Sequence, residues 1–480
     1  MHLPKKLAVA LLVTLISASI VSSTYAFPLS RAHLTPKEEG ELGDKLMLYV
    51  KEHYEFIRDP FIVDYVNRVG QQIVRQLPNP PFAFHFYVLK EDVYNAFAGP
   101  GGHVFVNSGL LGAMENEEAL AGILAHEISH VLCRHISEQI DRAKKISLAT
   151  AAGVLAGIFL GGSSDAAGAA MAGSAALGQS VALKYSRENE READEVGIKY
   201  LTKAGYGCEG LLEILLKMRN KRWFGPEQMP TYLSTHPALE SRLAYLDTWI
   251  QTHPQEARSV RPVDPSDFQK AQTRLIALYG EVETARETFD TRIGDNPEDA
   301  FAYYGKALLL DRENQERGAL EYLKEALHRR PLDPDIYRDL GKSYFHIGDY
   351  SNALKTLKGV LTYRPRDPEG WFLVGRAQME TGDLQGAVDS FKTLLEIAPN
   401  DLPGMYYLGD AYGRLGDLGE AHYCLGTYYK AKGDFENARF HLTRALSLET
   451  KDSERKKAIE EALKGLSEPQ QRDHNAKNAW

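Results

Sequence analysis

Residues 116–132 read NEEALAGILAHEISHVL, which places an HExxH motif on one predicted helix. Apolar residues recur at the spacing of helical turns, Asn116 is the expected N-cap, and two glutamates suit the positively polarised helix start. Because residues four apart share a helix face, His126 and His130 are predicted to bind one metal ion. Glu127 would take a proton from the water that attacks a peptide carbonyl. The alternative is a helix that merely carries two histidines.

A zinc hydrolase needs a third protein ligand, and residues 186–205 are expected to supply it. This segment is predicted to form a helix closed by Gly205, with Glu190 and Asp194 on its mostly apolar stripe. Carboxylates on such a stripe are costly unless a positive group meets them, so Glu190 is the predicted third ligand. Asp194 is expected to hold a ligand histidine or to assist proton transfer to the leaving amine. Its alternative is a surface salt bridge.

Motifs in order along the chain resemble the CAAX-prenyl-protease and heat-shock-protease superfamily of zinc peptidases. They are NAFAGPGG at 95–102, Gly109-Leu110-Leu111, the HExxH, Ser186-Arg187-x-x-Glu190-x-x-Ala193-Asp194 and His236-Pro237-x4-Arg242. The resemblance runs from about Thr35 to Trp249. It implies a gluzincin-type α+β core with the ligands His126, His130 and Glu190 and the base Glu127.

Two β-rich runs precede the HExxH helix, at residues 84–89 and 103–106, and the turn-forming Gly99-Pro100-Gly101-Gly102 lies between them. This pattern predicts a hairpin that leads into the helix. An extended peptide could add itself to such an edge as a further strand. A purely structural role for the hairpin is an equal alternative.

His236 is predicted to be a further functional residue, because Pro237 fixes the backbone after it and Arg242 could position it or a carboxylate. His236 would either stabilise the oxyanion of the transition state or occupy the open metal position and switch the enzyme off. A structural histidine at a helix start is the third interpretation. The preceding loop, residues 222–234, contains glycine and prolines and could act as a lid.

The first 26 residues are typical of a cleavable secretory signal, with Lys5 and Lys6, an apolar run and the small-residue exit Thr24-Tyr25-Ala26. The mature chain is therefore expected to begin near Phe27 and to reach the periplasm, with an uncleaved membrane anchor as the alternative. The net charge of −9 argues against nucleic acid as a partner.

The chain has three cysteines. Cys133, just beyond His130, is expected to be a buried small apolar residue rather than a ligand. An oxidising compartment would permit a Cys208–Cys424 bridge, which the sequence leaves open. Residues 146–183 are rich in alanine, glycine and aliphatics, and we expect a packed helical hairpin there. Peripheral membrane contact by this hairpin is the alternative.

The C-terminal half repeats every 34 residues, which is the tetratricopeptide spacing. The repeated small position is Ala285, Ala319, Ala353, Ala387 and Ala421, and the repeated proline is Pro297, Pro331, Pro365 and Pro399. Ala438 follows Ala421 after only 17 residues, as though one helix serves two neighbouring hairpins. The pattern predicts an irregular superhelix over about 268–448 and a polar tail over 467–480.

A signal segment, a zinc peptidase core and tetratricopeptide repeats together resemble the bacterial β-barrel assembly-enhancing protease family. The predicted chain is mainly α: a signal peptide at 1–26, a metallopeptidase domain with a small β-hairpin or sheet at 27–260, a repeat solenoid at 261–450 and a polar helix or tail at 451–480. One Zn²⁺ per chain is expected.

The resemblance implies a periplasmic endopeptidase that removes misfolded or stalled outer-membrane proteins and assists β-barrel assembly, with the repeats contacting the assembly machinery or the stalled precursor. The alternative is a docking chaperone at that machinery whose protease activity is mostly latent. An intact HExxH with Glu190 favours retained proteolysis, and His236 with the long array favours restrained activity.

Overall fold

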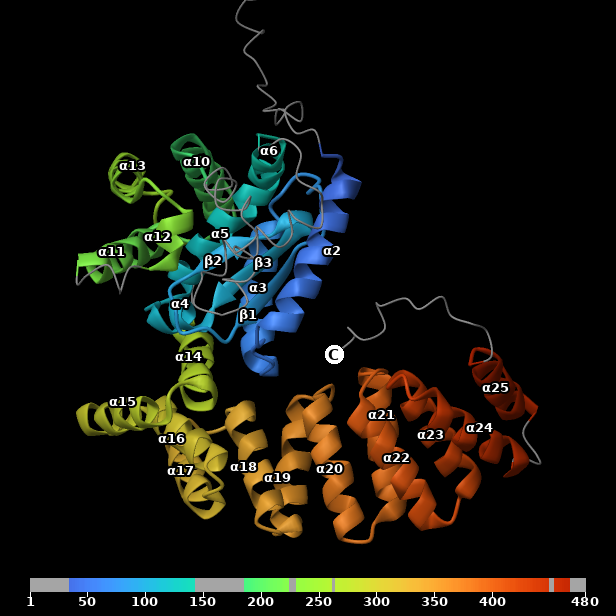
Figure 1. The fold of residues 1–480 in the computed structure, drawn as a ribbon. Coiled ribbons are helices and arrows are strands. Elements are labelled where there is room, and N and C mark those ends of the chain that lie inside the picture. The colour runs from blue at the N-terminus through green and yellow to red at the C-terminus, as the bar shows by residue number, and fades with distance from the viewer. Residues whose placement is uncertain (1–33, 143–184, 224–229, 261–263, 449–452, 467–480) are drawn as a thin grey trace, which may run out of the picture. The chain divides into compact units, whose positions relative to one another are not determined.

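The computed structural model describes residues 34–142, 185–223, 230–260, 264–448 and 453–466. The predicted signal peptide, the predicted hairpin at 146–183 and the polar tail lie outside the described residues, as does part of the predicted lid. The chain divides into two compact units (Figure 1). The first unit comprises residues up to 56 and 66–262, and the second, here called the repeat unit, comprises 57–65 and the residues from 263 onward.

The first unit contains a three-stranded sheet in the order β1-β3-β2. Its strands are β1 (His85–Leu89), β2 (Ala96–Ala98) and β3 (His103–Asn107). β1 pairs with β3 in parallel, with His85 opposite His103, and β2 pairs with β3 antiparallel. The predicted hairpin of 84–89 with 103–106 is therefore wrong. The short strand β2 reverses the chain between these two runs, so that β2 and β3 form the hairpin and β1 lies on the other side of β3.

Helices surround this sheet (Figure 1). They are α2 (Pro36–His53), α3 (Pro60–Val74), the 3-10 turn η2 (Pro100–Gly102), α4 (Ser108–Ala113), α5 (Glu117–Leu132), α6 (His135–Arg142), α10 (Arg187–Lys203), α11 (Glu209–Trp223), α12 (Thr231–Thr235) and α13 (Leu239–Thr252). α5 contacts α10 and α11 as well as β2 and β3. This central position explains why almost every residue of α5 is buried.

Local signals fix where α5 and α10 begin. The Asn116 side chain accepts a hydrogen bond from the backbone N–H of Ala119, as the N-cap prediction requires. Ser186 caps α10 in the same way and forms a reciprocal capping box with Asn189. Gly205 follows α10 with φ of 88°, a left-handed conformation that glycine adopts without strain. The predicted helix over 186–205 is thus present as α10.

The repeat unit is built from consecutive helices that pack on their neighbours along the chain. These are α14 (Pro265–Tyr279), α15 (Val282–Asp295), α16 (Ala300–Arg312), α17 (Glu316–Arg329), α18 (Pro334–His346), α19 (Tyr350–Tyr363), α20 (Pro368–Glu380), α21 (Leu384–Ile397), α22 (Leu402–Leu415), α23 (Leu418–Ala431), α24 (Phe435–Leu448) and α25 (Ser453–Lys464). All five alanines of the 34-residue series are buried, where their small size lets helices cross closely.

One helix, α23, serves two neighbouring helix pairs, as the 17-residue step predicts. A Cβ added at Gly409 of α22 would lie 3.0 Å from Leu425 Cγ of α23. A Cβ added at Gly426, also on α23, would lie 2.7 Å from Leu442 Cγ of α24. The same close approach of glycine to leucine therefore recurs after 17 residues on the two faces of a single helix.

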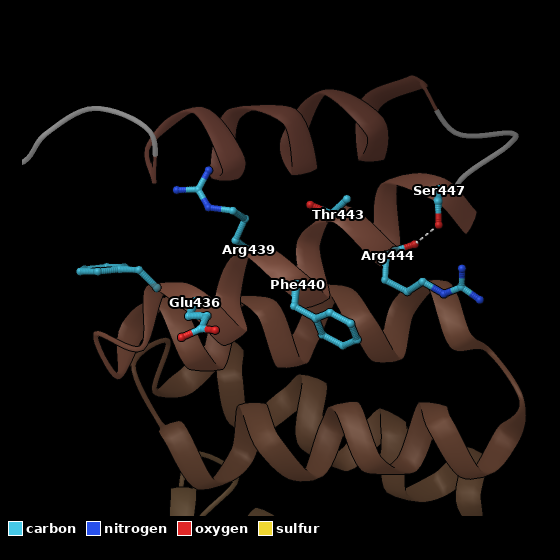
Figure 2. Close-up of a pocket in the computed structure, with 7 residues that line it drawn as sticks. Glu436, Arg439, Phe440, Thr443, Arg444 and Ser447 are labelled. Atoms are coloured by element: carbon cyan, nitrogen blue, oxygen red, sulfur yellow. Dashed lines mark hydrogen bonds between the residues drawn. The ribbon is translucent and has the colours of Figure 1, made fainter.

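The surface of α24 carries a pocket of about 820 Å³ (Figure 2). Phe435, Phe440, Arg439 and Arg444 contribute to its lining, and the Phe440 side chain is 62% exposed. Apolar rings beside guanidinium groups at a solvent-exposed surface are typical of protein-binding patches.

The mainly α class, with one small sheet and a helical repeat array, is confirmed. Across the described ranges, no helix is both long enough and apolar enough to cross a membrane.

Candidate metal centre

Four metal-binding side chains meet in the first unit. His126 and His130 come from α5, Glu190 comes from α10, and His236 directly follows α12. None of the four is more than 1% exposed. One ligand atom from each lies within 4.8 Å of the others. The structure therefore brings the three predicted ligands together and adds His236 to them.

The distances are those of side chains that converge on one point. The Nε2 atoms of His126 and His130 lie 3.0 Å apart, and each is 3.5 Å from a Glu190 carboxylate oxygen. His236 Nδ1 lies 3.0 Å from Glu190 Oε1 and 3.4 Å from His126 Nε2. Donor atoms at such spacings can share a tetrahedral metal ion.

Gly197 lets α10 approach α5 at the metal ligands. A Cβ at this position would lie 3.3 Å from the carbonyl oxygen of Ala125 and 3.4 Å from the backbone nitrogen of His126. Glu190, Asp194 and Gly197 follow one another at helical spacing, so one face of α10 supplies the ligand, its neighbour and the close contact.

Asp194 and Arg242 contact two of the predicted ligands, His126 and Glu190. His126 Nδ1 donates to Asp194 Oδ1 at 2.8 Å, which leaves Nε2 directed at the metal position. Arg242 donates to both Asp194 oxygens, at 2.8 and 2.9 Å, and its Nη1 lies 3.0 Å from Glu190 Oε2. Asp194 thus contacts a predicted ligand histidine, and Arg242 contacts the carboxylates of Asp194 and Glu190.

The charges of this buried site fit a divalent cation. The carboxylates of Glu190 and Asp194 share one buried guanidinium, that of Arg242, and Glu127 is a third buried carboxylate of the site. Burial alone would raise the pKa of Glu190, but His236 and Arg242 hold it well below its ordinary value. Two imidazoles and an ionised carboxylate form a donor set that suits zinc. The residues present thus fit the metal that the sequence predicts.

Glu127 has no hydrogen-bond partner for either carboxylate oxygen, although it is fully buried. Burial raises the pKa of Glu127 above its ordinary value. The Nε2 atom of His236 lies 3.6 Å from Glu127 Oε1. A carboxylate with unused acceptors and a raised pKa, next to a metal position, is suited to accept a proton from water.

Two tyrosines hold the histidines in place. The Tyr232 ring stacks on His236, with centroids 4.2 Å apart and planes inclined by 16°. The Tyr185 ring stacks on His130 at 3.8 Å and lies 5.0 Å from His236. Neither tyrosine could be predicted from the sequence, because no local pattern shows which aromatic ring covers which histidine. The one sequence signal for Tyr185 is that it directly precedes Ser186, the N-cap of the helix that carries Glu190.

His135 is a further residue at this site that the motifs do not predict. Its Nδ1 lies 2.9 Å from His130 Nδ1, and its Nε2 lies 3.3 Å from Glu192 Oε2. The motif spacing does not predict this contact because α5 ends at Leu132 and α6 begins at His135, so the two histidines belong to different helices.

All three cysteines, including Cys208 and Cys424, are free thiols in the structure.

The chain is similar in sequence to known proteins over both of its units. Residues 63–250 match the model of peptidase family M48, residues 304–359 and 338–401 match a tetratricopeptide repeat model, and 419–452 match another. The chain is 30% identical over 324 residues to a beta-barrel assembly-enhancing protease of Yersinia pestis, which covers 65% of each protein. It is 30% identical over 318 residues to the Escherichia coli K12 protein of that name, covering 64% of each.

A more distant relative is the mitochondrial metalloendopeptidase OMA1 of Schizosaccharomyces pombe, 28% identical over 187 residues, which covers 39% of this chain and 52% of that protein. The matches to the two bacterial relatives span slightly less than two thirds of their length. The matched ranges contain the HExxH helix, Glu190, His236 and the 34-residue repeats. The chain therefore carries a peptidase family M48 domain followed by tetratricopeptide repeats.

Proposed function

We propose that the chain is a zinc-dependent endopeptidase whose ligands are His126, His130 and Glu190. The observation that carries this proposal is the buried convergence of these three side chains next to the unpartnered carboxylate of Glu127. When bound, a zinc ion would polarise the scissile carbonyl and the attacking water.

The chain's own residues would perform the remaining steps. Glu127 accepts the proton of the attacking water and passes it toward the leaving amine. Asp194 keeps His126 in the tautomer that directs Nε2 at the metal, and Arg242 keeps Asp194 and Glu190 ionised. Tyr185 and Tyr232, both buried, exclude bulk water from the histidines that they cover.

His236 would hold the site in a resting, closed state. With its Nδ1 within 3.0–3.4 Å of Glu190 and His126, it is placed to occupy the fourth metal position, where water or substrate must enter. Catalysis then requires His236 to leave that position. A movement of α12, which directly precedes His236, would carry the imidazole outward.

The substrates would be misfolded or stalled outer-membrane proteins in the periplasm, and the chain would assist β-barrel assembly. The names of the bacterial relatives and the tetratricopeptide repeats support this part of the proposal. Tetratricopeptide arrays bind peptides or partner proteins, so the repeats would contact the assembly machinery or a stalled precursor. The exposed Phe440 and its neighbouring arginines on α24 are one candidate contact (Figure 2).

A docking chaperone with mostly latent proteolysis is the second candidate function. The observation that favours it is the position of the buried His236, 3.0 Å from Glu190 and 3.4 Å from His126, where it would occupy the fourth metal position until it moves. Expression of Glu127→Gln in cells that lack the protein separates the two candidates. Rescue of an outer-membrane assembly defect by Glu127→Gln would mean that docking suffices, and failure to rescue would mean that cleavage is needed.

Incubation of the chain from Phe27 with a denatured outer-membrane barrel protein tests the peptidase directly. We expect the barrel protein to be fragmented, and we expect no fragments with a chelator or with Glu127→Gln. A folded barrel protein serves as the substrate control and should stay intact. Equal fragmentation by Glu127→Gln would overturn the proposal.

A further inference from the structure

A second group of metal-binding side chains lies beside His130. It consists of Cys133, His135 and Glu192, and one ligand atom from each lies within 4.8 Å of the other two. The sequence predicts that Cys133 is a small apolar residue, but its thiol lies near an imidazole and a carboxylate. A thiolate, an imidazole and a carboxylate are all ligands that zinc accepts.

The chain holds this group with a fixed turn. Cys133 caps the end of α5, and its backbone N–H donates to the carbonyl oxygen of Ser129 at 2.9 Å. Arg134 then adopts a left-handed φ of 56° before α6 begins at His135. The Arg134 guanidinium donates to Glu39 at 2.8 Å and to the Leu34 carbonyl at 2.7 Å, so the turn between the two ligands is anchored at its centre.

The group is reachable from solvent on one side. The Glu192 side chain is 49% exposed, whereas the His135 side chain is 1% exposed. Cys133 is half-buried between them. The His135 Nε2 and Glu192 Oε2 atoms lie 3.3 Å apart, near the separation of about 3.5 Å that two ligands of a tetrahedral zinc ion require. A metal ion can therefore enter past Glu192 and meet the buried nitrogen.

We propose that Cys133, His135 and Glu192 bind a second Zn²⁺ ion. Binding of this ion would lower the affinity of His130 for the Zn²⁺ ion at the first site. Binding releases the Cys133 thiol proton to solvent, and the fourth position is left for water. The site rests on residues separate from the proposed catalytic ligands, and only its effect on cleavage depends on the proposed function.

The coupling follows from proton positions between two imidazoles. When His130 Nε2 ligates a metal, His130 Nδ1 carries hydrogen and donates to His135 Nδ1 across 2.9 Å. His135 Nε2 then carries its own hydrogen and donates to Glu192. A metal on His135 Nε2 moves that hydrogen to Nδ1, and two N–H groups face each other. The Nδ1–H of His130 then has no acceptor, so the His130 ring must rotate. This rotation lowers the affinity of His130 Nε2 for the metal ion at the first site.

Cobalt substitution tests the site, because only a thiolate ligand produces the thiolate-to-cobalt charge-transfer absorption in the near ultraviolet. We expect the metal-free full chain to show this absorption on Co²⁺ addition, and Cys133→Ala to lack it. Cys208→Ala and Cys424→Ala are matched controls and should keep it. Absence of the band in the unmodified chain, or its persistence in Cys133→Ala, would overturn the site.

Two more variants keep the test independent of folding defects. Cys133→Ser retains the size of the side chain, and Glu192→Gln changes an exposed group. We expect Cys133→Ser to lose the band and Glu192→Gln to need about tenfold more Co²⁺ to develop it. An unchanged titration in both would contradict the assignment.

Inhibition by added zinc tests the coupling between the two metal sites. For each protein, the cleavage rate with added zinc is compared with the rate of the same protein without it. We expect a second equivalent of Zn²⁺ to lower peptide cleavage about tenfold in the unmodified chain and less than twofold in Cys133→Ala. Equal zinc sensitivity in the two proteins would overturn the coupling. A chain that shows the cobalt band but never cleaves peptide would refute the proposed peptidase and leave the second site standing.

Discussion

Asp194 and Arg242 form a two-pronged ion pair inside the first unit, with Oδ1 2.8 Å from Nη2 and Oδ2 2.9 Å from Nε. The same Asp194 Oδ1 accepts from His126 Nδ1 at 2.8 Å. One carboxylate thus connects a guanidinium on α13 with a histidine of the HExxH motif on α5. Asp194 and Arg242 are both buried. Removal of either side chain would therefore leave the other charge unpaired and out of reach of water, which is strongly unfavourable.

This pair predicts a loss of metal affinity in Asp194→Asn. The amide keeps one acceptor oxygen but loses the negative charge and the second oxygen, so Arg242 and His126 Nδ1 compete for a single acceptor and the His126 ring is held less firmly. We expect zinc affinity to fall about 10- to 100-fold, as measured by competition with a chromophoric chelator. Glu195→Gln, an exposed change on the same helix, is the control and should bind zinc normally. Equal affinities for both variants would show that Asp194 has no part in holding the metal.

The position of His236 predicts faster cleavage in His236→Ala. Removing the imidazole opens the fourth metal position, so we expect a rise on the order of tenfold at unchanged zinc content. An oxyanion role predicts the opposite, a loss of about 10²–10³ in rate. His253→Ala removes an exposed histidine of the same unit and serves as the control. Unchanged zinc content together with an unchanged rate would leave His236 with a structural role only.

The double use of α23 predicts that Gly426→Ala destabilises the repeat unit. An alanine Cβ would lie 2.7 Å from Leu442 Cγ and 3.1 Å from the Leu442 backbone nitrogen, so α24 must shift. We expect the free energy of unfolding to fall by about 1–3 kcal/mol in urea denaturation. Gly359→Ala is the control, because no atom lies within 4 Å of its added Cβ. Its free energy of unfolding should rise by up to about 1 kcal/mol, since alanine favours a helix more than glycine does. A stabilised Gly426→Ala would contradict the shared-helix packing.

A buried charge cluster predicts acid sensitivity of the repeat unit. Burial alone would raise the pKa of Asp335, but Lys270 and Arg338 lower it from 3.8 to about 2. Lys270 Nζ lies 2.7 Å from Asp335 Oδ2. Because the folded pKa is the lower one, this stabilisation is fully present above pH 4 and is lost as the pH falls toward 2. It amounts to about 2 kcal/mol.

Urea titrations of the repeat helices at several pH values between 2 and 5 would measure this loss. We expect Asp335→Asn to flatten the dependence of stability on pH and Asp389→Asn, an exposed change on α21, to leave it unaltered. The same slope in Asp335→Asn as in the unmodified chain would mean that other carboxylates cause the acid sensitivity.

Much of the metal centre follows from local sequence signals. The HExxH spacing, the Asn116 cap and the carboxylates on the apolar stripe of α10 each depend on residues within a few turns of one helix. The 34-residue period likewise predicts the repeat helices, because each repeat packs mainly on its neighbours along the chain.

The sheet and the aromatic cover of the histidines could not be predicted in this way. Whether β1 pairs in parallel or antiparallel with β3 depends on the route of the chain through β2, which alternation within a strand does not reveal. The stacking of Tyr232 on His236 and of Tyr185 on His130 depends on how α5, α10 and α12 meet. His135 was missed because the turn at Arg134 redirects the chain between two helices.

The most direct test of the central claim is to count zinc per chain and to measure peptide cleavage in the same samples of three proteins that all carry Cys133→Ala, which removes the proposed second zinc site: Cys133→Ala alone, with Glu127→Gln, and with Glu190→Gln. We predict one zinc and cleavage in Cys133→Ala alone, one zinc without cleavage when Glu127→Gln is added, and neither when Glu190→Gln is added. Cleavage that persists in zinc-loaded Glu127→Gln, or full zinc binding by Glu190→Gln, would contradict the account.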